Sequence, residues 1–259
     1  MQIFVPTLKR VNKQPTYDEW IPVKWMPNTQ LVCPEEEVIA HRAKGRSALA
    51  CPVMGIANTR QWILDNSNDN KVLFIDDDHT FARRIVPTEP KLRQATHDDM
   101  NELFAIIDAK LDEYPFVGVS ARQGNNNSCP HTEVYNTRNC NMYGTRKDIL
   151  EQLGVKFNSN EVTGKEDFYV QLQLLTKGIK TLTLTEFVWN QGGSNAPGGC
   201  SVFRTLEKEK EDAERLAALY PQFVKTVVKD TKTGWAGLKN RTDVTIYWKK
   251  AFEWGLENG

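Results

Sequence analysis

The sequence predicts an α/β protein in which a mainly parallel sheet is flanked by helices. The first observation is that short apolar runs typical of strands alternate along the chain with segments whose apolar residues recur at helical spacing. The second is that acidic or polar residues directly follow several of these runs, where parallel strands end and ligands bind. We therefore expect the binding residues to gather beyond the carboxyl ends of the strands.

The N-terminal part of the chain is expected to contribute three strands and two helices. Residues 2–5 form an apolar run that Pro6 ends, and residues 31–33 form a second such run. Three glutamates follow soon after, which suits the first turn of a helix because the helix dipole favours acids there. Residues 55–65 have near-helical apolar spacing, and residues 71–75 form a third apolar strand.

The remainder of the chain is less regular. A polar, turn-rich stretch at residues 122–138 is predicted to be a surface loop, and residues 189–200 a glycine-rich loop. The other expected elements are helices over residues 100–111, 147–153, 168–177 and 205–220, strands over residues 116–120 and 179–185, and a further strand within residues 134–143.

Composition limits the classes of protein to which the chain can belong. Its 259 residues include 33 Lys and Arg against 33 Asp and Glu, so no net charge attracts nucleic acid and DNA binding would need a local basic face. No apolar run approaches the roughly 18 residues of a membrane-spanning helix, and the N-terminal charge order is the reverse of that in a signal peptide. Five scattered cysteines without a C-x-x-C pair favour free thiols in a reducing compartment. We expect a cytoplasmic protein.

Three adjacent aspartates, Asp76, Asp77 and Asp78, follow the apolar strand at residues 71–75. Carboxylates this close repel one another unless a cation, solvent or a basic group stabilises them. Carboxylate oxygens are preferred ligands of Mg²⁺ and Mn²⁺, which also hold the phosphates of a nucleotide. The cluster therefore predicts a site for a metal ion and a diphosphate, and the alternative is an acidic turn exposed to water.

A second acidic pair, Glu166 and Asp167, follows Gly164 and Lys165 at the predicted start of a helix. The helix dipole alone favours acids at this position, so the pair by itself is weak evidence of function. Together with the aspartate cluster it supplies the parts of a displacement reaction. A metal ion would neutralise the departing phosphate, and a carboxylate would take a proton from the attacking hydroxyl.

The order of these motifs resembles a glycosyltransferase of the GT-A fold. The motifs are Pro6-Thr7-x-x-Arg10 after the first strand, Gly55-Ile-Ala-x-x-Arg60 in a helix, FIDDD at residues 74–78 and GKED at residues 164–167. In that fold a D-x-D motif binds the metal and the sugar nucleotide, and the later acidic pair supplies the acceptor base in inverting members. The resemblance covers most of residues 1–190.

A narrower resemblance is to the bacteriophage TET-associated glycosyltransferases, which add sugars to 5-hydroxymethylpyrimidines in phage DNA. It rests on Trp189-Asn-Gln191-Gly-Gly193, on Gly198-Gly-Cys200-Ser201 with Arg204, and on the terminal segment DVTIYWKKAF. Many GT-A enzymes also use a C-terminal histidine as a metal ligand. This chain has no histidine after His131, so water, a third carboxylate or His79 would have to fill that role.

The resemblance implies a role for each matching residue. Asp78 and Asp76 would hold the metal, and Asp76 would also contact the ribose or the sugar. Asp167 would be the acceptor base, with Glu166 beside it. Thr7 and Arg10 would flank the nucleotide, and Arg60 would face its phosphates or base. Asp77 is also expected in the donor site. Independently of the resemblance, Gly192 and Gly193 are candidates for the donor site, and Arg204 could close over the donor.

Two further regions are candidates for contacts with substrate. The glycine pairs of residues 189–200 permit close backbone approach and could cradle a diphosphate or a DNA phosphate, unless the segment is only a flexible connector. In the C-terminal tail Lys239, Arg241, Lys249 and Lys250, beside Trp235 and Trp248, would suit phosphate contacts and stacking. The alternative is that these tryptophans pack into the core. Residues 125–127 and His131 are candidates for the acceptor side.

These observations predict a metal-dependent glycosyltransferase. Residues 1–203 would form the GT-A catalytic domain, and residues 204–259 a helical extension packed on it. The enzyme, with Mn²⁺ or Mg²⁺, would move a hexose, glucose being the first candidate, from a UDP-sugar to the hydroxymethyl group of 5-hydroxymethylcytosine in phage DNA, with inversion. The acceptor base would have to leave the DNA duplex to reach the metal site.

Two other functions are compatible with the same motifs. The acceptor could be a polysaccharide, a lipopolysaccharide or a protein. A catalytically silent module of the same fold could instead bind nucleic acid or glycan. For a phage enzyme, the expected location is the cytoplasm of the infected host.

Overall fold

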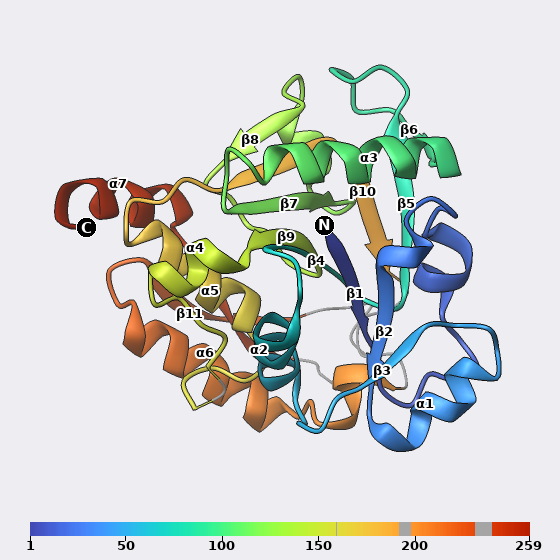
Figure 1. Cartoon of the computed structure of the whole chain (residues 1–259). Helices are drawn as coiled ribbons and strands as arrows, with labels where there is room; N and C mark the ends of the chain where they lie inside the picture. The colour runs from blue at the N-terminus through green and yellow to red at the C-terminus, as the bar shows by residue number, and fades with distance from the viewer. Residues whose placement is uncertain (159, 192–197, 231–239) are drawn as a thin grey trace.

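A mixed sheet of ten strands runs through the centre of the fold (Figure 1). The computed structural model describes residues 1–158, 160–191, 198–230 and 240–259. The strands of this sheet are β1 (Gln2–Pro6), β2 (Thr29–Cys33), β3 (Ala48–Ala50), β4 (Lys71–Ile75), β5 (His79–Arg84), β6 (Leu92–Gln94), β7 (Phe116–Ala121), β8 (Glu133–Tyr135), β9 (Met142–Arg146) and β10 (Leu182–Gln191). Their order is β3-β2-β1-β4-β9-β7-β10-β5-β6, and β8 also pairs with β10.

The first four strands of that order form a parallel block. β1 pairs in parallel with both β2 and β4, and β2 pairs in parallel with β3. β9 runs antiparallel between β4 and β7, whereas β7 and β10 are again parallel. The predicted mixed α/β fold with helices flanking a sheet is confirmed.

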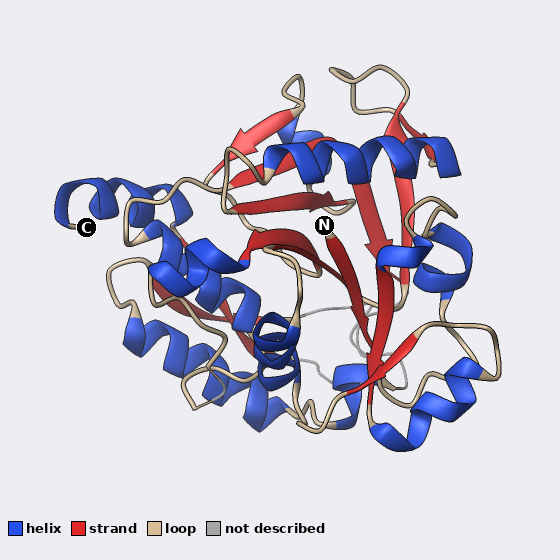
Figure 2. Cartoon of the chain, in the orientation of Figure 1, coloured by secondary structure: helices blue, strands red, loops and turns tan. Residues whose placement is uncertain are grey.

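Helices cover both faces of the sheet (Figure 2). On one face the buried side chains of β1 and β4 at Ile3, Leu73 and Ile75 pack with those of α3 (His97–Lys110). On the other face Phe4 and Phe74 pack with α2 (Ile56–Asn66), α4 (Lys147–Gln152) and α5 (Glu166–Leu175). Because these strands are buried on both sides, they are continuous apolar runs in the sequence.

The hairpin of β5 and β6 was not predicted, and it changes the boundary of the expected glycine-rich loop. Trp189 to Gln191 are not loop residues. They form the end of β10, whose antiparallel pairing with β5 places Trp189 opposite Phe81 and Gln191 opposite His79. The end of β10 therefore lies opposite the start of β5, at the edge of the sheet where the aspartate cluster lies. Gly192 and Gly193 are outside the described residues.

The C-terminal extension contains a strand pair as well as helices. Its elements are α6 (Leu206–Leu219), the antiparallel strands β11 (Val224–Lys229) and β12 (Arg241–Ile246), and α7 (Trp248–Asn258). Ala213, Leu216 and Ala251 share one apolar cluster with Leu172 and Leu175 of α5. A Cβ on Gly255 would lie 2.1 Å from the carbonyl oxygen of Leu175, so α7 approaches the end of α5 as closely as only glycine allows.

The helix α1 (Glu35–Arg42) completes the set of longer helices. In the described ranges, no helix combines the length and the apolar character needed to cross a bilayer.

Candidate active site

The aspartate cluster and the Thr7 to Arg10 segment meet at one edge of the sheet. β1 and β4 are neighbours in parallel, so the residues that follow them emerge at the same edge. Thr7 Oγ1 donates to Asp77 Oδ2 at 2.5 Å and accepts from Gln14 Nε2 at 2.6 Å. The Arg10 guanidinium contacts Asp77 and lies 3.0 Å from Asp78 Oδ2. Asp77 is buried. Its hydrogen bonds with Thr7 and Arg10 join the loop that follows β4 to the loop that follows β1.

A single buried arginine connects the aspartate cluster to the second acidic pair. Arg60 lies on α2 and is only 2% exposed. Its Nη2 lies 3.0 Å from Asp76 Oδ1, and its Nη1 forms an ion pair with Glu166 at the start of α5. Residues separated by about a hundred positions are thus brought together at one guanidinium.

The pKa values of these acids differ from those of exposed carboxyl groups. Burial raises the pKa of Asp76 to about 7 and that of Asp77 to about 6, although the nearby arginines act in the opposite direction. Burial likewise raises the pKa of Glu166 to about 7, opposed by Arg60. Groups with such pKa values exchange protons near neutral pH, as residues of active sites often do.

Asp167 follows Glu166 in the first turn of α5 and is largely buried. Its Oδ1 accepts a hydrogen bond of 2.8 Å from the backbone N–H of Phe168. Burial raises the pKa of Asp167, and the cations Arg60, Arg138 and Lys165 lower it. A carboxylate whose pKa is raised in this way is a suitable general base.

The structure places Arg204 in a buried ion network. Its Nε lies 2.9 Å from Glu209 Oε1, while Lys165 Nζ lies 2.9 Å from Glu209 Oε2 and 3.6 Å from Asp243 Oδ1. Lys165 immediately precedes Glu166. Arg204 is therefore linked through Glu209 of α6 and Lys165 to the start of α5, where Glu166 and Asp167 lie.

The residues present fit a divalent cation held jointly with a diphosphate. The side chains of Asp76 and Asp78 are 32% and 25% exposed, and each has one carboxylate oxygen in a bond to an arginine. For the other oxygen of each, the described residues provide no hydrogen-bond donor. No set of three His, Cys, Asp or Glu in the described ranges could hold a metal. Two carboxylates completed by phosphate oxygens and water are a common arrangement for Mg²⁺.

His79, which directly follows Asp78, is a fully buried ring stacked on Trp189, with centroids 4.7 Å apart. Burial lowers the pKa of His79 to about 4. Its ring packs in the protein interior, and neither ring nitrogen has a hydrogen-bond partner among the described residues.

Two of the residues considered for the acceptor side, Asn125 and His131, form hydrogen bonds with other parts of the fold. Asn125 is buried, its Nδ2 donates to the carbonyl of Thr185 at 2.8 Å, and its Oδ1 accepts from Arg84. The carbonyl of His131 accepts from Arg84 at 2.8 Å. Asn125 and His131 thus provide hydrogen-bond acceptors for the buried Arg84.

Sequence reasoning missed the role of Tyr143 and of Lys165. Tyr143 on β9 is fully buried, and its ring lies 5.2 Å from the Arg60 guanidinium carbon. Its hydroxyl has no hydrogen-bond partner among the described residues. Lys165 had no role of its own in the prediction from the GKED motif. A lysine directly before an acidic pair nevertheless indicates that its charge compensates the acids.

A family model described as TET-Associated Glycosyltransferase matches residues 1–199. Two relatives described as "Beta-glucosyl-HMC-alpha-glucosyl-transferase", from Enterobacteria phages T6 and T2, are 27% and 26% identical over 245 residues, covering 86% of this chain and 82% of each relative.

Two solved structures are similar in fold. The mannosyltransferase PcManGT from Pyrobaculum calidifontis, in complex with GDP-Man and Mn²⁺, gives a TM-score of 0.51 at 14% identity over 85% of this chain and 64% of that chain. A mycobacterial protein gives a TM-score of 0.50 at 10% identity over 95% of this chain and 83% of that chain. At these identities the likeness concerns the fold, and it is the GT-A fold that the motif order implied.

Proposed function

The chain belongs to the TET-associated glycosyltransferase family, and on that premise we propose that this glycosyltransferase moves a hexose from a UDP-sugar to a modified cytosine in phage DNA. The observation that carries the proposal is the buried Arg60, which joins the aspartate cluster to the Glu166 and Asp167 pair. A donor diphosphate at the cluster would lie close to a carboxylate that can accept a proton. The phage relatives, whose description names HMC, favour a DNA acceptor.

The donor would bind at the open edge of the sheet. Asp76 and Asp78 would hold Mn²⁺ or Mg²⁺ through the carboxylate oxygens that no arginine engages among the described residues, and the bound cation would neutralise charge on the departing diphosphate. Arg10, with Thr7 and Asp77 fixing its loop, would lie on the nucleotide side. Solved neighbours of this fold include one described with GDP-Man and Mn²⁺.

Asp167 would act on the acceptor. Its carboxylate would take the proton of the acceptor hydroxyl while that oxygen forms a bond to the anomeric carbon of the sugar. The bond from this carbon to the diphosphate breaks, and UDP leaves with the electron pair. Attack from the face opposite the leaving group inverts the anomeric centre, so an α-linked donor would give a β-linked product.

The description of the phage relatives raises a second possibility for the acceptor and the stereochemistry. It names a β-glucosyl-HMC acceptor and an α-glucosyl product. For this chain the corresponding acceptor would be a hydroxyl of a glucose already attached to hydroxymethylcytosine. An α-linked product from an α-linked donor would retain the anomeric configuration, and Asp167 would then not be a base for direct displacement.

Mass spectrometry of nucleosides distinguishes these acceptors. The protein would be incubated with Mn²⁺ and a panel of UDP-sugars on unmodified, hydroxymethylated and β-glucosyl-hydroxymethylated DNA, and NMR of the purified product would give the anomeric linkage. One hexose added to hydroxymethylcytosine in β linkage supports the inverting proposal. Addition only to the glucosylated base, in α linkage, supports the second possibility. Hydrolysis of UDP-sugar without addition to any DNA would contradict both.

A matched pair of variants tests the base. Asp167→Asn keeps the shape of the side chain and should lower kcat by about 10²- to 10⁴-fold, the usual contribution of a general base, with little change in the affinity for UDP. Asp98→Asn, an exposed change on α3, is the control. Both unfolding midpoints must be compared, because a destabilised protein would imitate an inactive one. Full activity of Asp167→Asn would remove it from the mechanism.

A further inference from the structure

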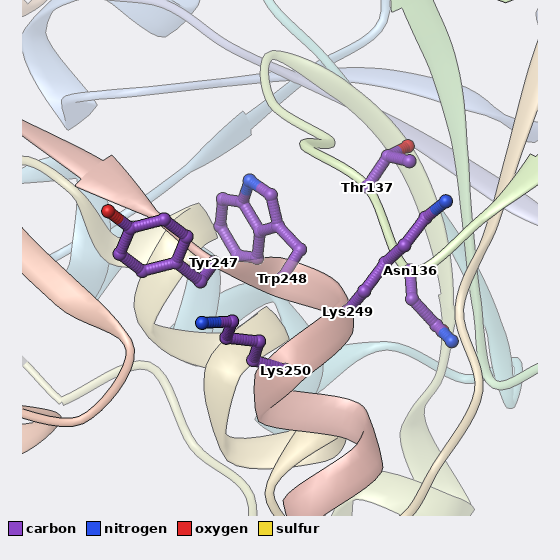
Figure 3. Close-up of a pocket in the computed structure, with 6 residues that line it drawn as sticks. All are labelled: Asn136, Thr137, Tyr247, Trp248, Lys249 and Lys250. Atoms are coloured by element: carbon purple, nitrogen blue, oxygen red, sulfur yellow. The ribbon is translucent and has the colours of Figure 1, made fainter.

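A pocket of about 260 Å³ lies between the loop before β9 and the start of α7. Asn136 and Thr137 form one side, and the other side consists of four consecutive residues, Tyr247, Trp248, Lys249 and Lys250 (Figure 3). The loop side is firmly anchored, since Asn136 Oδ1 accepts from the backbone N–H of Thr181 at 3.0 Å and Thr137 Oγ1 lies 2.9 Å from Thr183 Oγ1. The anchored side of the pocket therefore faces a side that is formed by two aromatic residues and two lysines.

One aromatic ring separates this pocket from the proposed base. The Trp248 ring packs edge-on against Phe168, with centroids 5.5 Å apart. The backbone N–H of Phe168 is the donor that holds Asp167. The guanidinium carbon of Arg138, which is exposed and follows Thr137, lies 5.2 Å from the same Phe168 ring. The pocket thus borders the acceptor side of the site.

Among the described residues, no acidic side chain pairs with the lysines of the pocket. Lys249 and Lys250 are exposed, and no carboxylate in the described ranges lies within ion-pair distance of either. Lys225 of β11 adds a third cation, because its Nζ is 5.7 Å from the Tyr247 ring, and Lys250 Nζ is 5.2 Å from that ring. The first turn of α7 contains no acid. Lysines are unfavourable in a first turn, so their presence does not serve the stability of the helix.

The volume of the pocket and the lysines beside it favour a long polyanion over an enclosed small molecule. At about 260 Å³ it is smaller than the roughly 300–1,000 Å³ of pockets that enclose a small-molecule ligand. A local contact with a long polyanion needs no enclosure, and it needs cations that are free to bind phosphate. Tyr247, which is 37% exposed, offers a ring for a sugar or base to pack on.

We infer that this pocket binds the phosphodiester backbone of the acceptor DNA strand, beside the nucleotide that receives the sugar. The inference rests on the proposed function and adds to it the surface that positions the DNA. Lys249 and Lys250 bind phosphates, while Tyr247 packs against the adjoining nucleotide. The base to be modified is then directed past Trp248 and Phe168 toward Asp167.

A binding experiment with matched charge changes tests this surface. The probe is a fluorescein-labelled single-stranded oligonucleotide that contains hydroxymethylcytosine, measured by anisotropy with UDP and Mn²⁺ at several salt concentrations. The variants are Lys249→Ala with Lys250→Ala, the same pair changed to Arg, and the control Lys208→Ala with Lys210→Ala on α6. The control removes the same charge from another helix, where Lys210 is exposed and Lys208 is half-buried, and each lysine faces a glutamate of α6.

Loss of two phosphate contacts has a defined signature. Each contact with a single strand contributes about 0.7 to the steepness of the fall of log K with log salt. The alanine pair should therefore reduce that steepness by about 1.4 and weaken binding about fivefold to tenfold at about 0.2–0.3 M salt, and more at lower salt. The arginine pair should bind like the unchanged protein, and so should the control. Unchanged binding by the alanine pair, or equal loss in the control, overturns the inference.

The outcome separates this inference from the proposed function. If the unchanged protein glycosylates DNA and the alanine pair binds and modifies it equally well, only the pocket assignment fails. If the unchanged protein hydrolyses UDP-sugar but neither binds nor modifies the DNA, the proposed function fails first. An unfolding midpoint of the alanine pair within about 2 °C of the unchanged protein would exclude misfolding as the cause of weaker binding, because a loss of 1 kcal/mol shifts the midpoint by about 2–4 °C at this chain length.

Discussion

Replacing Arg60 with methionine removes the cation on which the two acidic groups of the site depend. The side chains of Arg60 and Glu166 are 3% and 6% exposed, whereas that of Asp76 is 32% exposed. Breaking a buried pair by deleting one partner typically costs about 3–5 kcal/mol, because a buried charge is left without compensation. The partly exposed pair with Asp76 should add less than about 1 kcal/mol. We therefore expect most of the lost free energy of unfolding to come from the broken ion pair with Glu166.

A double-mutant cycle measures this difference. Arg60→Met, Glu166→Gln and the double variant should give a coupling energy of about 2–3 kcal/mol, and the cycle with Asp76→Asn should give less than about 1 kcal/mol. Urea unfolding followed by tryptophan fluorescence gives the free energies. Arg122→Met, a change at an exposed arginine, is the control and should cost at most about 0.5 kcal/mol.

The pH dependence of Arg60→Met follows from the raised pKa of Glu166. Its folded-state pKa of about 7 lies above the unfolded value of about 4.3, so the stability linked to its protonated form is present at low pH and is lost as pH rises through about 7. Without Arg60 the pKa of Glu166 rises further. The loss of stability should therefore be smaller at pH 6 than at pH 8. Equal losses at both pH values, or a coupling below about 0.5 kcal/mol, would refute this account of the site.

Three other changes have expected outcomes. Asp78→Asn should abolish the rise in unfolding temperature that Mn²⁺ with UDP gives the unchanged protein in a thermal-shift assay. Asp99 is buried and its pKa is held far below the usual range by hydrogen bonds from arginines and the backbone. It stabilises the fold above its unfolded pKa of about 4, so Asp99→Asn should cost about 1–3 kcal/mol in urea unfolding at pH 7 and progressively less as pH falls below 4. Gly118→Ala would place a Cβ 2.0 Å from Asn139 Oδ1, and it should cost more than about 2 kcal/mol by urea unfolding, whereas Ser120→Ala on the same strand should cost under about 1 kcal/mol.

The parallel block of the sheet was predictable because its strands are buried on both faces. β1 and β4 match the expected runs to within one residue, and the helix predicted at residues 55–65 is observed as α2. The same reasoning predicted that the residues after these strands would gather at one edge, since parallel strands end at a common edge. Asp76 and Asp78 lie at that edge, where each has one carboxylate oxygen bonded to an arginine.

The hairpin of β5 and β6 could not be predicted because its burial depends on distant partners. β5 has the sequence HTFARR, in which two arginines argue against a buried strand. Arg84 is nevertheless 1% exposed, and its donors reach the carbonyls of Pro87 and His131 and the side chain of Asn125. A buried arginine becomes acceptable only when the fold supplies such acceptors. No local pattern in the sequence contains that information.

The two acidic motifs were recognised separately, but the ion pair that unites them was not. Arg60 was assigned to the phosphates or base of the donor, whereas in this structure its guanidinium is engaged by Asp76 and Glu166. Residue type and order can indicate which groups carry the chemistry. Which acid faces which cation depends on how α2 and α5 pack on the same face of the sheet.

The C-terminal extension contributes to the site although it lies beyond the residues that the family model matches. Lys165, directly before the acidic pair, is compensated by Glu209 of α6 and Asp243 of β12, and all three side chains are largely buried. Removing either acid would leave a buried cation two residues from Asp167 and shift the balance of charge that sets its pKa. The same extension carries Lys249 and Lys250 at the pocket beside Phe168. A change in the extension is therefore expected to alter both the protonation of the proposed base and the proposed DNA surface.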